Sequence, residues 1–291
     1  MEGLWRKVPL FWRVAGPLLL LGLVLLALLQ GRPDGRLHLY FLPVGQGNAV
    51  LLLSPSGRSV LIDGGPEATA LLDRLGRLRP YGKPGLDLVL LSETTPGRLA
   101  GPVAVVERYP VRSAGRPGRR TSSPALERWE GLLAQAGVEV WPLSRGARIE
   151  LGDGVVLEVL HPGPTPLPGA PSGEGDDALV LRVRYGDFAA LLPTAAGPAA
   201  QEALLAAEPD LRSTVLLLPR QAGERALERR FLEAVRPALA VVSAGSGYHV
   251  GPDARTLALV EDAGIPLYRT DRQGTVEVVT DGRTVEVRTE R

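Results

Sequence analysis

Short apolar runs separated by turn residues dominate the first third of the chain. Runs of four to six apolar residues bounded by glycine, proline, asparagine or serine are typical of β-strands. One segment instead places leucines three and four residues apart, which predicts a helix with one apolar face. The expected strands lie at 37–42, 49–53, 60–62 and 86–91, and the expected helix at 69–78.

The rest of the chain alternates between the two patterns. Strands are expected at 139–142, 155–160, 178–185, 188–192, 214–218, 239–243, 267–270 and 275–280, and helices at 124–136, 198–207, 224–235 and 254–263. The stretch 162–175 is rich in proline and glycine and is expected to be a loop. Two β-rich halves with helices on the outside predict an α/β fold, a two-sheet sandwich of about twelve strands flanked by helices.

The N-terminus has a different pattern. Residues 14–29 form an uncharged, mostly leucine run of 16 residues, preceded by Arg6, Lys7 and Arg13. A membrane span needs about 17 to 25 apolar residues, and basic residues at one end are typical of the cytoplasmic side. We expect residues 1–30 to be a cytoplasmic tip and membrane anchor, with a cleaved signal peptide and a buried helix as the alternatives. Either membrane reading places residues 31–291 outside the cytoplasm, and the anchor places them at the cell membrane.

Charge and composition narrow the function classes. The formal net charge is +1; the first 30 residues carry three basic groups against Glu2, or +2, so the remainder carries −1. A body without basic excess is unlike a dedicated nucleic-acid binder. The chain has no cysteine, which excludes disulfides, thiolate zinc sites and cysteine nucleophiles.

The histidines do not form a metal-binding pattern. There are three, at positions 38, 161 and 249, and none is paired at a spacing of two or four residues. A catalytic zinc site generally needs three protein ligands. Carboxylates could still hold Mg²⁺ or Mn²⁺, which prefer oxygen. The candidate carboxylates for such a site are Asp63, Glu93, Asp176 and Asp253.

A series of short motifs follows the strands in order. They are Val44-Gly45-Gln46-Gly47-Asn48-Ala49, Leu61-Ile62-Asp63-Gly64-Gly65, Leu91-Ser92, His161-Pro162, Leu179-Val180-Leu181-Arg182, Tyr185-Gly186-Asp187-Phe188, the segment 231–237 and the segment 269–274. Together these motifs resemble the metallo-β-lactamase-like domain of the DNA-uptake competence protein ComEC. The resemblance spans residues 37–291 and implies an αββα four-layer sandwich, as one domain.

The sequence departs from this family where the family binds metal. The first histidine position is Glu93, the aspartate is Gly97 and the last histidine is Arg98. A later histidine pair is Arg220 and Gln221, and the metal-binding aspartate that follows the 188–192 strand is replaced by Ala195. We therefore expect no metal, no cofactor and no catalysis.

The same comparison implies a cleft lined by Asp63, Glu93, Arg98, Arg220 and Gln221. Two guanidinium groups facing one cleft need a carboxylate partner or a bound anion. We expect an arginine–carboxylate cluster there, with Arg225 as a further candidate, and Asp63 either capping its turn or contacting a ligand.

Several functions stay open at this point. The chain is expected to be a pseudoenzyme that binds an anion, DNA or an envelope protein in this cleft; a carboxylate-based, metal-dependent phosphodiesterase or nuclease and a purely structural envelope partner are the alternatives. The turn Gly45-Gln46-Gly47 is expected to serve backbone geometry, or else to cradle a phosphate. The clusters Arg116, Arg119, Arg120 and Asp176, Asp177 are expected to lie in solvated loops, with a nucleic-acid patch as the alternative for the arginines.

Overall fold

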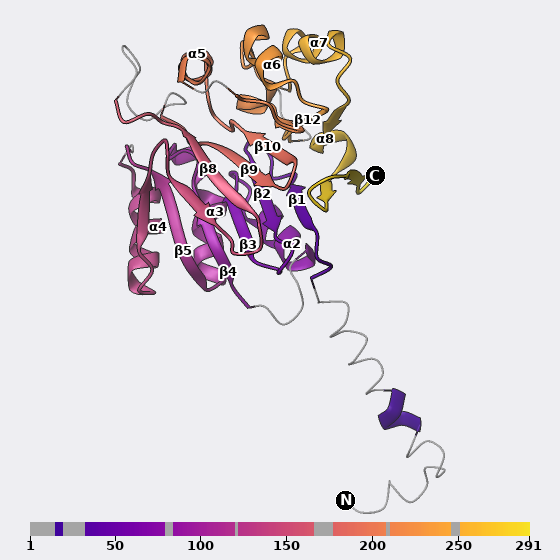
Figure 1. The fold of residues 1–291 in the computed structure, drawn as a ribbon. Coiled ribbons are helices and arrows are strands. Elements are labelled where there is room, and N and C mark those ends of the chain that lie inside the picture. The colour runs from indigo at the N-terminus through magenta and orange to yellow at the C-terminus, as the bar shows by residue number, and fades with distance from the viewer. Residues whose placement is uncertain are drawn as a thin grey trace, which may run out of the picture.

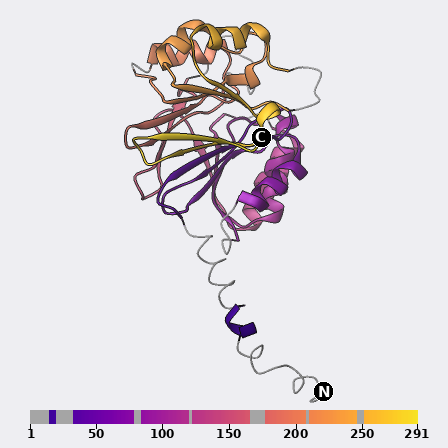
Figure 2. The ribbon, with the colours of Figure 1, turned by 90° about the vertical axis from the view of Figure 1, so that its right-hand side faces the viewer.

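The computed structural model describes residues 15–19, 33–78, 84–119, 122–165, 177–207, 210–245 and 251–291. Two β-sheets stack face to face, and helices cover their outer faces (Figure 1). Figure 2 shows the layers edge-on, with α3 and α4 beside the first sheet and α5 to α7 beside the second. The predicted α/β sandwich with four layers is therefore confirmed.

The first sheet has eight strands, in the order β15-β14-β1-β2-β3-β4-β5-β6. Its strands β3 to β6 run parallel, and the others are antiparallel to their neighbours. The strands are β1 Leu37–Phe41, β2 Ala49–Leu53, β3 Ser59–Asp63, β4 Leu86–Leu90, β5 Val111–Pro117, β6 Val140–Leu143, β14 Val276–Thr280 and β15 Val285–Thr289, and the helices beside them are α2 Ala68–Leu78, η2 Pro96–Arg98, α3 Ala100–Arg108 and α4 Pro124–Gln135.

The second sheet has seven strands, in the order β13-β12-β11-β10-β9-β8-β7, and strands β10 to β13 run parallel. Its elements are β7 Arg148–Glu150, β8 Val156–His161, β9 Val180–Tyr185, β10 Phe188–Leu192, α5 Pro198–Ala207, β11 Val215–Leu217, η3 Pro219–Ala222, α6 Arg229–Val235, β12 Leu239–Val242, α7 Ala254–Asp262, β13 Leu267–Arg269 and α8 Thr270–Gln273.

Three apolar clusters hold the layers together. The largest lies between the sheets and includes Phe41 and Phe188. A second packs α2, α3 and α4 on the first sheet through residues such as Trp129, and a third packs α5, α6 and α7 on the second sheet around Phe231. Each parallel strand therefore ends at a loop that a rigid, doubly covered sheet positions.

Several elements were not expected from the sequence, namely η2, α3, β5, β7, η3, α8 and β15. Two of them show the physical reason. Helix α3 carries Gly101 and Pro102 in its first turn, where a proline is tolerated because its missing N–H needs no partner. Strand β5 contains Gly115, whose Cα lies so close to its neighbours that an added Cβ would be 2.9 Å from Leu90 and Leu143 side-chain atoms.

Two further expectations need correction or stay untested. Helix α6 begins at Arg229, not at 224, because Arg225 has a positive φ of 51°. The expected membrane segment, 14–29, lies outside the described residues except for residues 15–19, which are helical. Among the described residues, no helix has the length and apolar character needed to cross a membrane.

Candidate functional site

Asp63 is the last residue of β3 and lies at the carboxyl end of the parallel strands. Its φ of 59° is left-handed, a conformation that aspartate tolerates better than most residues. The buried carboxylate accepts hydrogen bonds from the backbone N of Ser92, at 2.7 Å, and from the Ser92 hydroxyl. Asp63 therefore ties the end of β3 to the loop that follows β4, a contact between two loops and not the cap of its own turn that was expected.

Burial sets the ionisation of this carboxyl group. Burial raises the pKa of Asp63, the hydrogen bonds from Ser92 lower it, and the charges of Glu93 and Arg98 raise and lower it in turn; the net effect is a pKa of about 7. Asp63 therefore titrates near neutral pH.

The loop after β4 contains an ion pair. The Nε atom of Arg98 lies 3.8 Å from the carboxylate of Glu93, and Thr95 donates its hydroxyl to the same carboxylate at 2.7 Å. Nη1 of Arg98 donates to the carbonyl of Gln46 at 2.8 Å. The expected arginine–carboxylate contact is thus present between Glu93 and Arg98. Asp63 makes no ion pair with either arginine and is satisfied by Ser92 instead.

The Gly45-Gln46-Gly47 turn connects the two sheets. Gly45 has a φ of 76°, and a Cβ on Gly47 would lie 2.7 Å from the Cα of Gly65. The carbonyl of Gly47 accepts a hydrogen bond, at 2.9 Å, from the hydroxyl of Ser243, which follows β12. Backbone conformation and close packing thus require these glycines, in agreement with the expectation that the turn serves backbone geometry.

The loop after β11 has an unusual backbone. Arg220, Gln221 and Ala222 have φ values of 47°, 52° and 56°. A left-handed conformation costs roughly 1–2 kcal/mol per residue for a side chain with a Cβ, and such strain clusters at functional sites. The backbone N of Arg220 donates to the carbonyl of Thr194, at the end of β10, at 2.6 Å.

These loops border a cavity of about 220 Å³. Gln46 lines this cavity, and its backbone carbonyl accepts a hydrogen bond from Arg98, so the Glu93–Arg98 pair lies next to the cavity wall. The side chain of Arg220 makes no ion pair within the part of the chain that the structure describes. Arg225 is exposed and is not among the lining residues. The cavity is lined by Gln46, Arg220, Gln221, Gly223, Ala244, Gly245, Gly251 and Pro252.

The carboxylates proposed as an oxygen-ligand set do not gather. Asp253 caps α7 by accepting from the backbone N atoms of Arg255 and Thr256, at 3.0 and 3.1 Å. Asp176, like His249, lies outside the described residues. Across the described ranges, no group of three or more histidine and acidic side chains is placed to hold a metal ion.

Two loop expectations were wrong. Arg116 belongs to β5 and donates to Glu130 at 2.6 Å, and Arg119 donates to Asp177 at 2.8 Å. Asp177 is buried, with 8% of its surface exposed. These arginines are therefore occupied by structural ion pairs and do not form a solvated basic patch; Arg120 lies outside the described residues.

Sequence reasoning also missed contributors to the site. Ser92, Thr194 and Ser243 lie one or two residues after a strand, and each forms a hydrogen bond with a neighbouring loop. Their position was the signal, since a small polar residue shortly after an apolar strand lies at the edge of the sheet. Gln46 was noted only as part of a glycine turn.

Comparisons with known proteins identify the fold. No family model matches the sequence, and no curated protein matches it either. The structure is similar to the metallo-β-lactamase fold protein YhfI from Bacillus subtilis, with a TM-score of 0.55 and 12% identity over 83% of this chain and 99% of YhfI.

It is also similar to a mutant of the β-hydroxylase CmlA from Streptomyces venezuelae, with a TM-score of 0.51 and 14% identity. That match covers 83% of this chain and 53% of CmlA, so the chain spans about half of that protein. At such low identities the likeness establishes a metallo-β-lactamase type of fold and no shared activity.

Proposed function

We propose that this chain is a non-catalytic, ComEC-type metallo-β-lactamase-fold domain that binds an anionic ligand in the cavity beside Arg220. Residues 14–29 are proposed to anchor it in the cell membrane, with the domain outside the cytoplasm. The observation that carries the proposal is the exposed Arg220 side chain, which lines a cavity between loops of both sheets and has no acidic partner among the described residues.

A catalytic metal ion does not fit the described residues of this cleft. The carboxylate of Glu93 is engaged by Arg98 and Thr95, and that of Asp63 by Ser92. A dication near Glu93 would also approach the guanidinium of Arg98, and like charges in a partly dry site repel by several kcal/mol, on the order of the Coulomb energy at 4 Å. We therefore derive no metal-dependent step.

An anion suits the cavity better. Arg220 provides a fixed positive charge with a planar set of donors, and the side-chain amides of Gln46 and Gln221 can donate further hydrogen bonds. The cavity, about 220 Å³ in volume, admits a phosphate, a carboxylate or one unit of a larger anionic polymer. DNA and an acidic segment of an envelope protein both present such groups.

Metal content and activity test the non-catalytic part. We expect the purified full chain to contain no stoichiometric zinc, manganese or magnesium, and to show no phosphodiesterase or nuclease activity with these ions. A bound metal together with turnover that Asp63→Ala or Glu93→Ala abolishes would replace the proposal with the metal-dependent hydrolase.

Anion binding is tested with inorganic phosphate as the probe. We expect phosphate to raise the thermal unfolding midpoint of the full chain, since a ligand that binds only the folded state stabilises it. Arg220→Gln should abolish the shift. Arg225→Gln is the matched control, because Arg225 is exposed, has a similarly positive φ and does not line the cavity. A shift that survives Arg220→Gln, or none with the unaltered chain, contradicts the proposed site.

A further inference from the structure

Strand β15 is the outermost strand of the eight-stranded sheet. It pairs with β14 over five residues in regular antiparallel register, from Val285 opposite Thr280 to Thr289 opposite Val276. Natural proteins protect such edges with prolines, bulges, very short strands or charged side chains. β15 has no proline or bulge, and its two charged residues are one acid and one base, which leaves a regular edge on which a strand of complementary charge can form hydrogen bonds.

The register shows which backbone groups face outward. The backbone N of Glu290 donates to the carbonyl of Thr275 at 3.1 Å, so this pair is a hydrogen-bonded one. Along an antiparallel ladder, hydrogen-bonded pairs alternate with non-hydrogen-bonded ones. Arg288 and Glu286 lie two and four residues before Glu290, so their backbone groups also form hydrogen bonds with β14. The N–H and C=O groups of Val287, and of its neighbours two residues away, therefore point outward. Within the described residues, no other strand pairs with this edge of β15.

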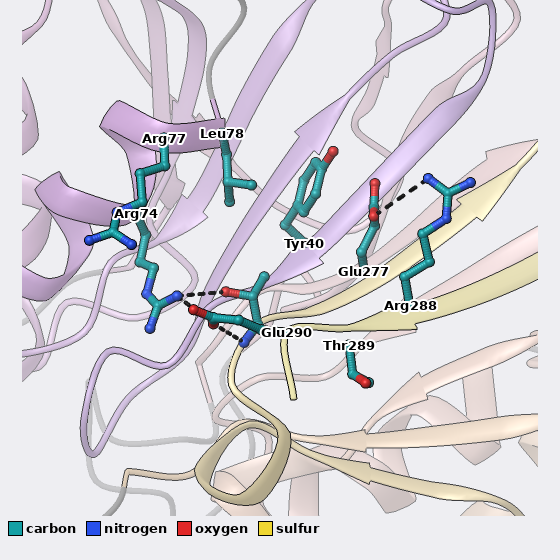
Figure 3. A pocket seen from close by; sticks show the side chains of 9 residues that line it. Tyr40, Arg74, Arg77, Leu78, Glu277, Arg288, Thr289 and Glu290 are labelled. Carbon is teal, nitrogen blue, oxygen red and sulfur yellow. Dashed lines mark hydrogen bonds and ion pairs between the residues drawn. The ribbon is translucent and has the colours of Figure 1, made fainter.

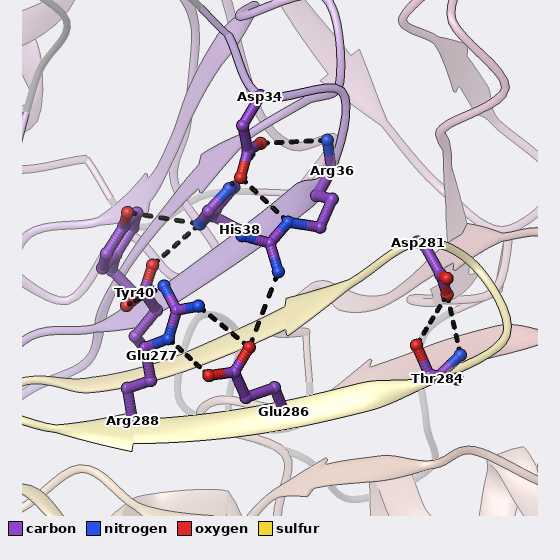
Figure 4. Close-up of polar contacts among 9 residues, drawn as sticks. All are labelled: Asp34, Arg36, His38, Tyr40, Glu277, Asp281, Thr284, Glu286 and Arg288. Carbon is purple, nitrogen blue, oxygen red and sulfur yellow. Dashed lines mark hydrogen bonds and ion pairs between the residues drawn. The ribbon is translucent and has the colours of Figure 1, made fainter. Parts of the chain in front are cut away.

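The side chains of β15 divide between its two faces. Val285 and Val287 pack against the apolar cluster between the sheets. Glu286 and Arg288 lie on the outer face, where the Nε atom of Arg288 is 2.8 Å from the Glu286 carboxylate (Figure 4). Within the described residues, α2 reaches the end of this strand only through Arg74, which donates to Glu290. A cavity of about 250 Å³ lies between Arg77 and Leu78 of α2 and the outer strands (Figure 3).

We propose that β15 pairs with β15 of a second copy of this chain, antiparallel and centred on Val287. A twofold axis at Val287 makes its outward N–H and C=O groups the partners of the same groups in the other copy. The neighbouring pairs then set Glu286 of each copy opposite Arg288 of the other. They are non-hydrogen-bonded pairs, in which side chains lie closest across the strands.

The sequence of β15 favours a second copy over an unrelated strand. Its two charges have opposite signs and lie one residue on either side of Val287. In a twofold antiparallel pairing, this spacing turns both cross-strand contacts into attractive ones, whereas two like charges would repel. On the inner face, Val287 meets Val287 of the second copy, so the apolar layer between the sheets continues from one copy to the other.

Sedimentation of the full chain in detergent tests the proposal. We expect a reversible dimer. Glu286→Arg or Arg288→Glu alone sets like charges opposite each other twice, and each should raise the dimer dissociation constant about tenfold or more. An equimolar mixture of the two variants should recover the dimer, because the two positive positions of one copy then face the two negative positions of the other.

Two further variants locate the interface. Val287→Pro removes an outward N–H that the β14 ladder does not use, so it should abolish the dimer and leave the fold intact. Glu150→Arg, on the edge strand β7 of the other sheet, is the matched control and should change nothing. A chain that is monomeric at every concentration reached, or a dimer that neither the charge reversals nor Val287→Pro weakens, overturns the proposal. A mixture that fails to recover the dimer overturns the register.

Discussion

Asp63 should make the stability of this protein fall as the pH rises. Its folded-state pKa is about 7, raised from 3.8 mainly by burial. A carboxyl group with a raised folded-state pKa stabilises the fold fully below its unfolded-state pKa, and the stabilisation is lost as the pH rises through the folded-state value. The loss therefore occurs between about pH 4 and pH 7.

The magnitude follows from the size of this shift. A rise from 3.8 to about 7 corresponds to about 4 kcal/mol of unfolding free energy, at about 1.4 kcal/mol per pH unit. Asp63→Asn removes the titration and can keep both contacts with Ser92, because the serine hydroxyl can accept as well as donate. Asp63→Ala instead leaves the buried N–H and hydroxyl of Ser92 unpaired, which costs about 1–3 kcal/mol for each group.

Urea unfolding, followed by tryptophan fluorescence, measures both effects. The unfolding free energy of Asp63→Asn minus that of the unaltered protein should increase by about 4 kcal/mol from pH 4 to pH 8. Asp63→Ala should be less stable than Asp63→Asn at every pH. Asp187→Asn, at an exposed turn, is the control and should run parallel to the unaltered protein. Parallel curves for Asp63→Asn and the unaltered protein would refute the reasoning.

Three other expectations can be checked directly. Burial lowers the pKa of His38, but hydrogen bonds to Glu277, at 2.7 Å, and to Asp34 raise it above its ordinary value (Figure 4). The stabilisation by His38 should therefore be present below about pH 6.5 and be lost as the pH rises through the raised pKa. NMR titration of the imidazole measures the pKa, and His38→Gln should remove this pH dependence of the unfolding free energy. Asp177→Ala should lower the unfolding free energy by roughly 1–3 kcal/mol, because it leaves the guanidinium of Arg119 without its hydrogen-bond acceptor. Protease added to intact cells should digest the domain if it lies outside the cytoplasm; complete protection would contradict the proposed topology.

The apolar pattern predicted most of the fold for a clear physical reason. Strands such as β2 and β4 are almost entirely buried, so their sequences are continuous apolar runs. The missed strands β7 and β15 have exposed charged residues and lie at the sheet edges, where burial imposes no such pattern. Helix α3 was missed because glycine and proline in a first turn look like a loop.

The candidate site was predicted only in part. Asp63 ends β3, Glu93 and Arg98 lie in the segment after β4, and Arg220 and Gln221 lie in the loop after β11. Of the five residues expected to line one cleft, Arg220 and Gln221 line the cavity and the other three do not. Which carboxylate pairs with which arginine depends on side-chain direction and loop conformation, and no local pattern encodes either. The partner of Arg119 shows the same limit, since Asp177 is 58 residues away in sequence.

A chain of hydrogen bonds joins the loops near the cavity, and the first of them crosses between the sheets. The carbonyl of Ser92 accepts from the backbone N of Leu179 at 2.7 Å, and the carbonyl of Leu179 accepts from the hydroxyl of Thr194 at 3.2 Å. Thr194 in turn accepts from the backbone N of Arg220 at 2.6 Å. Ser92 and Thr194 are fully buried, so these bonds are shielded from water. A ligand is therefore not needed to bring the loops together, and the binding energy of an anion at Arg220 need not be spent on ordering them.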